Sequence, residues 1–257
     1  MSKFVILGAA ALALSLASPA FAKDLTPVGQ NGWGGAFVGI QGGYAKENRT
    51  GCGDFGANIN VGGFVVNVLP DPGPIDSCAG AGSLTYNYDQ SGELFGVDVG
   101  YNWTPSELFL VGLQLDASLS NITGEIDPNN PFGGTATVNS LVTATAKAGL
   151  TTGRFLLYGE AGAALENVKF DGNAQCDFSM GHTGPVAGVG VSYKLSDVAS
   201  LDVKYDHIWL GAQDSSCTSQ LLNIDTPPIS VNVPTELRTE GAADVIKVGL
   251  NFALGGK

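Results

Sequence analysis

The sequence predicts an all-β fold: an eight-stranded antiparallel transmembrane up-and-down β-barrel with short periplasmic turns and long extracellular loops. Three observations predict it. Eight segments alternate between apolar and polar residues, as strands with two different faces do. The connections between these segments alternate between short and long, and aromatic residues gather near both ends of the segments. All three features are typical of barrels of the outer-membrane type.

Each of the eight segments is long enough for a strand of about ten residues, the length with which a tilted strand crosses a bilayer. The 37 glycines and the long stretches of Asn, Thr, Ser and Gly fit a β protein with many turns. No stretch has the periodicity of a long amphipathic helix. The expected strands are 34–46, 92–103, 108–120, 139–151, 154–166, 183–195, 200–211 and 243–254.

The connections alternate without exception. Tight turns are expected at 104–107, 152–153 and 196–199, whereas the connections at 47–91, 121–138, 167–182 and 212–242 are long. An antiparallel meander places every other connection at the same end, so all short turns lie at one end and all long loops at the other. A soluble barrel has no physical reason to show this asymmetry.

The two faces of each predicted strand differ in composition. One face is a continuous apolar band, while the other carries glycine, small polar residues and isolated charges. Such a face suits the narrow interior of an eight-stranded barrel, and only 14% of the chain is charged, which is little for a solvated face. Acids and bases on it nearly balance, as paired charges in a confined lumen should. The expected lumen charge network consists of Asp98, Asp116, Lys147, Glu160, Lys194, Asp202, Lys204, Asp206 and Lys247.

The stretch Leu201-Asp-Val-Lys-Tyr-Asp-His-Ile-Trp209 illustrates the assignment of faces. Leu201, Val203 and Trp209 are expected to face lipid, while the charged residues between them face the lumen and pair with groups such as Lys147, Glu160 or Lys247. The pattern predicts that Val203→Lys impairs membrane assembly more than Lys204→Gln.

The positions of aromatic residues support the prediction of two membrane–water interfaces. One expected belt lies beside the short turns and the other at the opposite ends of the strands, with aliphatic residues between them. The first belt consists of Trp103, Phe109, Phe155, Tyr193 and Phe252, and the second of Tyr44, Phe95 and Trp209.

The start of the chain predicts export. Residues 1–22 form an expected signal peptide, with Lys3 as the positive residue, an apolar stretch at 4–18 and the cleavage box Ala20-Phe21-Ala22. Residues 23–32 are expected to be a periplasmic segment and 33–257 the barrel. No later apolar run reaches the length of a spanning helix, which excludes a helical membrane protein. The net charge of −12 disfavours nucleic acid as a partner, because neutralising phosphates needs clustered Lys and Arg.

Three strands resemble a known family. The first, Trp33-Gly-Gly-Ala-Phe-Val-Gly-Ile-Gln-Gly-Gly-Tyr44, resembles the first strand of small alphaproteobacterial outer-membrane proteins, which belong with the OmpA-like and opacity-protein eight-stranded, porin-like barrels. The stretches 201–211 and 245–252 resemble the penultimate and closing strands of that family. The resemblance implies localisation in the outer membrane of a Gram-negative cell, contact with outer-membrane lipid and lipopolysaccharide, and insertion by the barrel assembly machinery.

Four cysteines lie in the expected long loops: Cys52, Cys78, Cys176 and Cys217. An even number on the oxidising side of the cell envelope predicts two disulfides, for which three connectivities exist. We favour Cys52–Cys78 and Cys176–Cys217. A metal site is the weaker interpretation, because no C-x-x-C spacing occurs and His182 and His207 are the only histidines. No metal or cofactor is expected.

Three functions remain open. The preferred one is a non-enzymatic barrel that contributes to envelope structure, a surface antigen whose loops serve adhesion or ligand recognition. The loop segments 62–69, 221–224 and 229–233 are apolar, and they either extend hairpins beyond the membrane or form a contact surface for a host or surface ligand.

The alternatives are a lipid-A-modifying enzyme and a small-pore porin. Eight strands leave little room for a channel. For catalysis, His207 lies on the lipid-facing side between Tyr205 and Trp209 without a serine or other catalytic partner, and His182 beside Ser179 is a weak pair.

Overall fold

The computed structural model describes residues 32–69, 84–127, 133–172, 178–225 and 228–254. Ten antiparallel strands form one sheet in the order β1-β4-β5-β6-β7-β8-β9-β10-β2-β3, and pairing between β1 and β10 closes the first eight of this order into a barrel. None of the described residues forms a helix long and apolar enough to cross a membrane. The strands are β1 (Gly35–Phe55), β2 (Ala57–Val61), β3 (Phe64–Leu69), β4 (Leu84–Trp103), β5 (Phe109–Ile126), β6 (Gly134–Thr152), β7 (Phe155–Gly172), β8 (Phe178–Lys194), β9 (Ala199–Asp225) and β10 (Pro228–Leu254).

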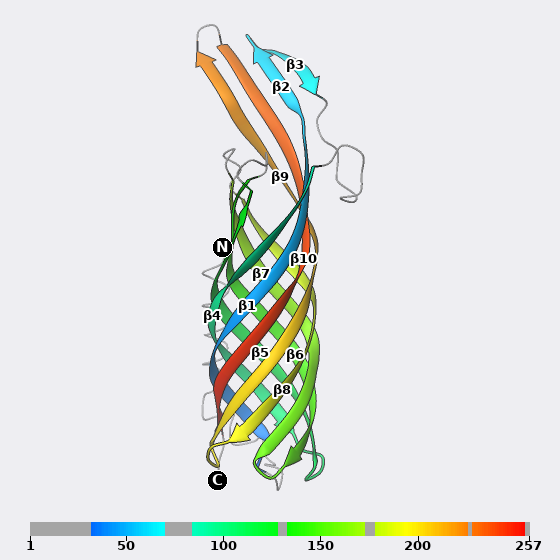
Figure 1. Cartoon of the computed structure of the whole chain (residues 1–257), viewed down its shortest axis with the longest axis vertical. Coiled ribbons are helices and arrows are strands. Elements are labelled where there is room, and N and C mark those ends of the chain that lie inside the picture. Colours follow the sequence, from blue (N-terminus) through cyan, green and yellow to red (C-terminus); the bar gives the residue numbers. More distant parts are fainter. Residues whose placement is uncertain (1–31, 70–83, 128–132, 173–177, 226–227, 255–257) are drawn as a thin grey trace.

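The closed ring of eight tilted strands confirms the predicted fold class (Figure 1). At the short-turn end, every strand begins or ends within one residue of its expected boundary. At the opposite end the strands are longer than expected, by 5 residues for β6, which begins at 134 rather than 139, and by 15 for β10, which begins at 228 rather than 243. Much of what the sequence placed in long loops is therefore strand.

The outward face of the barrel is apolar only over the part nearest the short turns. On β1 the apolar outward residues run from Ala36 to Tyr44, about the nine to eleven residues with which a tilted strand crosses a bilayer. Lys46 then continues the same face and is exposed. On β4 the outward face changes from apolar to charged between Phe95 and Glu93, both of which are exposed. We call this apolar belt of the outer wall the apolar band; it ends at Tyr44, Phe95, Leu119, Leu165 and Ile246, among others.

The composition of the interior changes at the same level, in the direction opposite to that of the outer wall. Within the apolar band most inward side chains are charged, polar or glycine, apart from an apolar group at the short-turn end, whereas beyond the band most of them form an apolar cluster. Water surrounds the wall beyond the band, so burial of apolar side chains inside stabilises that part as it does in a soluble barrel. The cluster includes Tyr86, Tyr88, Leu94, Ile122, Ile126, Val138, Leu141, Val168, Phe170, Val186, Ile208, Leu210, Leu237 and Val245.

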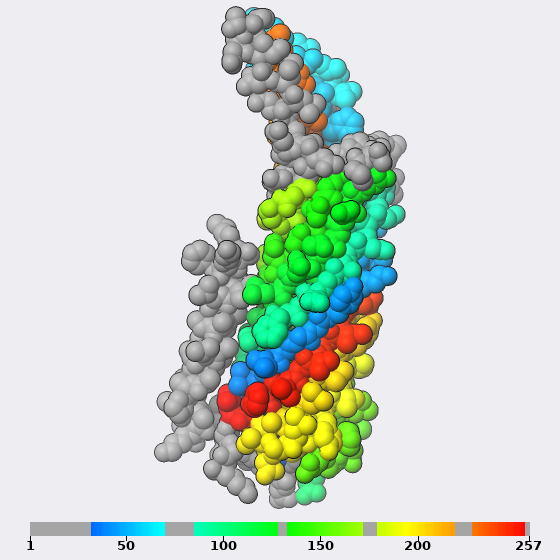
Figure 2. All heavy atoms as spheres, turned by 60° about the vertical axis from the view of Figure 1, so that its left-hand side comes forward, coloured from blue at the N-terminus to red at the C-terminus, as the bar shows by residue number. Residues whose placement is uncertain are grey.

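A small sheet projects beyond the barrel at the end away from the short turns (Figures 1 and 2). β2 and β3 form a hairpin through Gly62 and Gly63, whose φ angles of 59° and 92° are those of a turn that needs positive φ at both positions. β2 pairs with residues 229–232 of β10, which pairs in turn with β9. We call β2, β3 and the outer ends of β9 (212–225) and β10 (228–236) the tip sheet.

Candidate functional site

Lys204 lies at the centre of the lumen charges. Its Nζ atom is 3.2 Å from Asp116 Oδ2, 3.2 Å from Glu160 Oε1 and 3.8 Å from Asp206 Oδ2. Lys247 Nζ is 3.7 Å from Asp116 Oδ1 and 3.8 Å from Asp206 Oδ2. All five side chains are buried. The expected pairs of Lys204 with Glu160 and of Asp206 with Lys247 are present.

Neutral polar groups complete this network. Asp202 accepts a hydrogen bond of 2.9 Å from the Tyr158 hydroxyl and another from Ser192. Lys147 donates to Gln114 Oε1 at 3.0 Å. Asp98 is buried on the inward face of β4. Side chains therefore fill the lumen at the level of the apolar band.

An apolar plug lies at the short-turn end of the lumen. Trp33, Leu110, Leu156 and Tyr158 form a buried cluster there, and the Trp33 indole N–H donates to the carbonyl of Gly153 at 3.4 Å. Because Trp33 precedes β1, the first residues of the barrel domain help to close its own opening.

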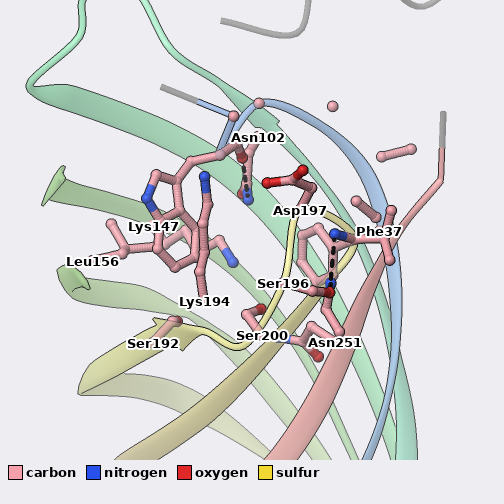
Figure 3. A pocket seen from close by; sticks show the side chains of 18 residues that line it. Phe37, Asn102, Lys147, Leu156, Ser192, Lys194, Ser196, Asp197, Ser200 and Asn251 are labelled. Atoms are coloured by element: carbon pink, nitrogen blue, oxygen red, sulfur yellow. Dashed lines mark hydrogen bonds between the residues drawn. The ribbon is translucent and has the colours of Figure 1, made fainter. Parts of the chain in front are cut away.

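A small pocket lies beside this plug (Figure 3). Its cavity of about 50 Å³ has room for a few water molecules. Lys147 Nζ lies 4.4 Å from the centre of the Phe37 ring, and Lys194 Nζ lies 4.8 Å from that of Trp33. Lys194, expected in the charge network, lies at this opening instead. The two lysines pack on the rings by cation–π contact, which strengthens the closure.

A second group of polar residues, which we call the buried polar layer, lies inside the barrel beyond the apolar band. It consists of Glu47, Arg49, Gln90, Glu166 and His182, all at most 2% exposed. Arg49 Nη2 lies 2.9 Å from Glu47 Oε2 and also ion-pairs with Glu166, while Gln90 donates to Glu47. Two carboxyl groups thus share one guanidinium among apolar side chains.

Burial sets the charge of this layer. Burial, together with the nearby Glu47, raises the pKa of Glu166 to about 8 despite the attraction of Arg49. Burial and the positive charge of Arg49 lower the pKa of His182 to about 4. Near neutral pH, Glu166 is therefore protonated and His182 neutral.

Sequence reasoning missed this layer. It placed Glu47 and Arg49 in a loop and His182 beside Ser179, but His182 faces the interior whereas Ser179 is exposed on the outer face of β8. The alternation does continue through Lys46, Asn48 and Thr50 on the outside. Because the inward residues at this level are also polar, the two faces of the strand do not differ in hydrophobicity, and the sequence gives no sign of the layer.

His207 has a partner that the sequence did not indicate. Asp244 on β10 lies opposite it, and the Asp244 Oδ1 atom is 2.7 Å from His207 Nδ1 and 2.5 Å from the Tyr205 hydroxyl. His207 thus has a hydrogen-bond partner on this face, although the expectation that no serine lies beside it is unchanged. Across the other neighbouring strand it faces Ala187, so neither neighbour across the sheet supplies a nucleophile.

The residues of the two expected aromatic belts lie on the outer wall. Trp103, Phe109, Phe155 and Phe252 are exposed near the short turns, where the half-buried Tyr193 stacks at a tilt on Phe155 with ring centres 4.9 Å apart. Tyr44, Phe95 and Trp209 are exposed near the other edge of the apolar band.

Two of the four cysteines are described. Cys52 is buried on β1, Cys217 is half-buried on β9, and no described cysteine is free. Cys78 and Cys176 lie outside the described residues, so their pairing stays a prediction, as do the expected signal peptide at 1–22 and segment 23–32. Among the residues that the structure describes, no group of three or more His, Cys, Asp or Glu side chains is placed to hold a metal ion.

Comparison with known proteins gives a family. The family model described as "Outer membrane protein beta-barrel domain" matches residues 8–233. The chain is 28% identical over 256 residues to the 31 kDa outer-membrane immunogenic protein of Brucella melitensis, covering 90% of this chain and 98% of that protein, and equally to that of Brucella suis.

Solved structures of low similarity were also found. The outer membrane protein OprG of Pseudomonas aeruginosa is 13% identical with a TM-score of 0.43, covering 87% of this chain and 99% of that one. Ail, the attachment invasion locus protein of Yersinia pestis, is 14% identical with a TM-score of 0.35, covering 81% and 99%. The family match spans most of the chain, which therefore belongs to the outer membrane protein β-barrel domain family and is an outer-membrane protein.

Proposed function

We propose that this protein is a non-enzymatic, non-conducting outer-membrane barrel that holds a recognition surface, the tip sheet, away from the membrane. The observation that carries the proposal is the reversal of polarity along the strands. Beyond the apolar band the barrel has a mainly apolar interior, which also holds the buried polar layer, and a polar outer wall, so it continues as a folded stalk in water. A stalk of this kind fits the presentation of a binding surface.

The interior argues against a pore. The lumen carries an apolar plug at the short-turn end, a charge network within the band and an apolar cluster beyond it. Eight strands enclose only enough space for such side chains. A solute would have to displace all three layers, which favours a structural and binding role over transport.

We expect disulfides to stabilise the outer end of the barrel, where the tip sheet begins. Cys52 lies near the outer end of β1, and Cys217 lies on the part of β9 that belongs to the tip sheet. We propose that these cysteines bond with Cys78 and Cys176 in the pairing favoured above. Such bonds limit the motion of the tip sheet, so that less conformational entropy is lost when a partner binds. Exposure at the cell surface also agrees with the name of the Brucella relative, an outer-membrane immunogenic protein.

Removal of the hairpin tests this function. Deletion of residues 57–69 should abolish attachment that the chain confers on a non-adherent Gram-negative host, measured on a fixed mammalian-cell monolayer and on a lawn of bacteria displaying the chain. The barrel should still assemble, because the ring closes through β1 and β10 without β2 or β3; heat-modifiable gel migration measures this.

The matched control carries Lys169→Ala and Asp171→Ala, an exposed pair on the outer wall of β7, and should attach like the original chain. The proposal fails if the original chain confers no attachment to either surface, or if the deletion leaves attachment unchanged on both.

A further inference from the structure

The hairpin of β2 and β3 exposes apolar side chains on both of its faces. All six residues of β3 are exposed, and five of them are apolar. Phe64 is 79% exposed and Val66 55%, and Val65, which points to the opposite face, is 63% exposed. Residues 57–69 contain no charged residue. A folded partner with one complementary surface would cover one face of this hairpin, whereas a lipid surface can surround both.

The outer strand of the hairpin does not have the geometry of a strand that adds to another sheet. Val68 is left unpaired between Asn67, which pairs with Asn58, and Leu69, which pairs with Ala57. Such a bulge is one of the features that keep an edge strand from pairing with further strands. The exposed side chains therefore indicate a partner that contacts the apolar groups rather than the strand edge.

The end of the hairpin satisfies its own backbone donors. The Gly62 N–H donates to the carbonyl of Pro228 at 2.9 Å, and the Gly63 N–H donates to Asn60 Oδ1 at 3.0 Å. Beside this turn, Val61 and Phe64 pair across the two strands. A backbone group enters a nonpolar medium at little cost only where its hydrogen bond is already made. The turn and the apolar pair beside it can therefore enter a lipid interface.

We propose that the hairpin inserts its turn into the headgroup region of an opposing bilayer of zwitterionic phospholipid; this inference names a partner for the proposed recognition function and rests on it. Insertion at an interface gains free energy in proportion to the apolar area that leaves water. The hairpin stays at the depth of the headgroups, because within the described residues only β2 is bonded to β3, and the backbone groups on the outer edge of β3 need water or headgroups as partners.

The position of the hairpin excludes the membrane that holds the barrel. Asn232 of β10 pairs with β2, whereas Ile246 of the same strand lies at the edge of the apolar band. At about 3.3 Å per residue, the strand between them is about 45 Å long. The hairpin therefore lies at the far end of the molecule (Figure 1), where it meets a membrane that approaches from outside.

Charge favours a zwitterionic surface over an anionic one. Asp54, Asp214 and Glu236 lie on the strands that carry the hairpin, and the chain has a net charge of −12. An anionic bilayer repels these carboxylates over a distance of about 10 Å at 0.1 M salt. A zwitterionic bilayer has no net charge and allows the uncharged hairpin to approach.

Binding to vesicles tests the insertion. The full chain is held in lipid nanodiscs, and its co-flotation with phosphatidylcholine vesicles is measured. We expect the double variant Phe64→Ser, Val65→Ser to bind at least tenfold less tightly than the original chain, because two exposed apolar side chains no longer leave water. Addition of phosphatidylglycerol to the vesicles should weaken binding of the original chain, most strongly at low salt.

The matched control is the double variant Leu195→Ser, Val198→Ser. Both residues are exposed and apolar, and they lie in the turn between β8 and β9 at the other end of the molecule. This variant loses two apolar side chains without changing the hairpin, so it should bind the vesicles like the original chain.

Fluorescence quenching distinguishes insertion from loose contact. With brominated phosphatidylcholine in the vesicles alone, the indole added by Phe64→Trp should be quenched on binding. An indole added by Lys169→Trp, on the exposed outer wall of β7, should keep its fluorescence.

Three results would contradict the proposal: undiminished binding of the Phe64→Ser, Val65→Ser variant, an unquenched Phe64→Trp, or tighter binding to anionic vesicles. If the original chain does not bind phosphatidylcholine vesicles while deletion of 57–69 still abolishes attachment to mammalian cells, a bilayer is the wrong partner and the recognition function stands.

Discussion

Replacement of Lys204 by methionine is expected to lower the free energy of unfolding by about 3–5 kcal/mol. The substitution keeps most of the side-chain volume but leaves Asp116, Glu160 and Asp206 in the lumen without their shared cation. Breaking a buried ion pair by removing one partner has a cost of this size, because an uncompensated charge stays buried. Urea unfolding of the protein in lipid bilayers measures the effect.

Lys169→Met is the matched control. Lys169 forms an ion pair with Asp171, but both side chains are about half exposed, so its loss should change the free energy of unfolding by less than about 1 kcal/mol. Adding Asp116→Leu to Lys204→Met should restore part of the loss, since it removes one of the three carboxylates that shared Lys204 and leaves Lys247 to Asp206. A Lys204→Met protein as stable as its Lys169→Met counterpart would show that the lumen charges do not depend on one another.

The second large effect is a dependence of stability on pH that Glu166→Gln removes. The pKa of Glu166 is about 8 in the folded protein, above the ordinary value of 4.5. The folded state therefore holds this proton more tightly than the unfolded state. Its contribution to stability is complete below about pH 4.5 and is lost as pH rises to about 8, at roughly 1.4 kcal/mol per pH unit.

The groups that face Glu166 explain the sign. Glu47 repels its ionised form and Arg49 attracts it, while burial opposes ionisation most strongly. His182 acts in the opposite sense: its folded pKa of about 4 lies below the ordinary 6.5, so its contribution is lost as pH falls through that range. The two dependences offset each other between about pH 4.5 and 6.5, and from 6.5 to 8 the loss from Glu166 remains alone.

Unfolding curves at several pH values test this account. Glu166→Gln should gain stability relative to the original chain as pH rises from 5 to 8, by several kcal/mol in total. The control Glu125→Gln changes an exposed carboxyl on the outer wall of β5 and should run parallel to the original chain. A constant difference between Glu166→Gln and the original chain would contradict a protonated Glu166.

Alternation along the strands predicted the transmembrane part of the fold well. There the outside is lipid and the inside polar, so the two faces contrast strongly, and the short turns fixed strand ends to within one residue. Beyond the band the contrast weakens: Lys46, Asn48 and Thr50 on the outside of β1 alternate with Glu47 and Arg49 inside. A strand with polar residues on both faces resembles a loop in sequence, so the stalk and the buried polar layer were missed.

Partners across strands were harder to predict than faces. Parity placed Lys204 in the lumen, but only the register brings three carboxylates to it. The expected ranking of Val203→Lys above Lys204→Gln stays a prediction. A lysine facing lipid costs about 2–4 kcal/mol, which overlaps the cost of about 3–5 kcal/mol expected for loss of Lys204. Asp244 lies 37 residues from His207 along the chain, and pairing of β9 with β10 unites them.

The position of the membrane along the barrel is the central claim, and β4 tests it most directly. The measurement is nuclear magnetic cross-relaxation from lipid acyl chains and from water to the outward residues of this strand in lipid nanodiscs. Contacts with acyl chains should extend from Val99 to Phe95 and give way to contacts with water at Glu93 and Asp89. Acyl-chain contacts that continue to Asp89, or water contacts at Val99, would contradict the reversal of polarity on which the stalk and its recognition surface depend.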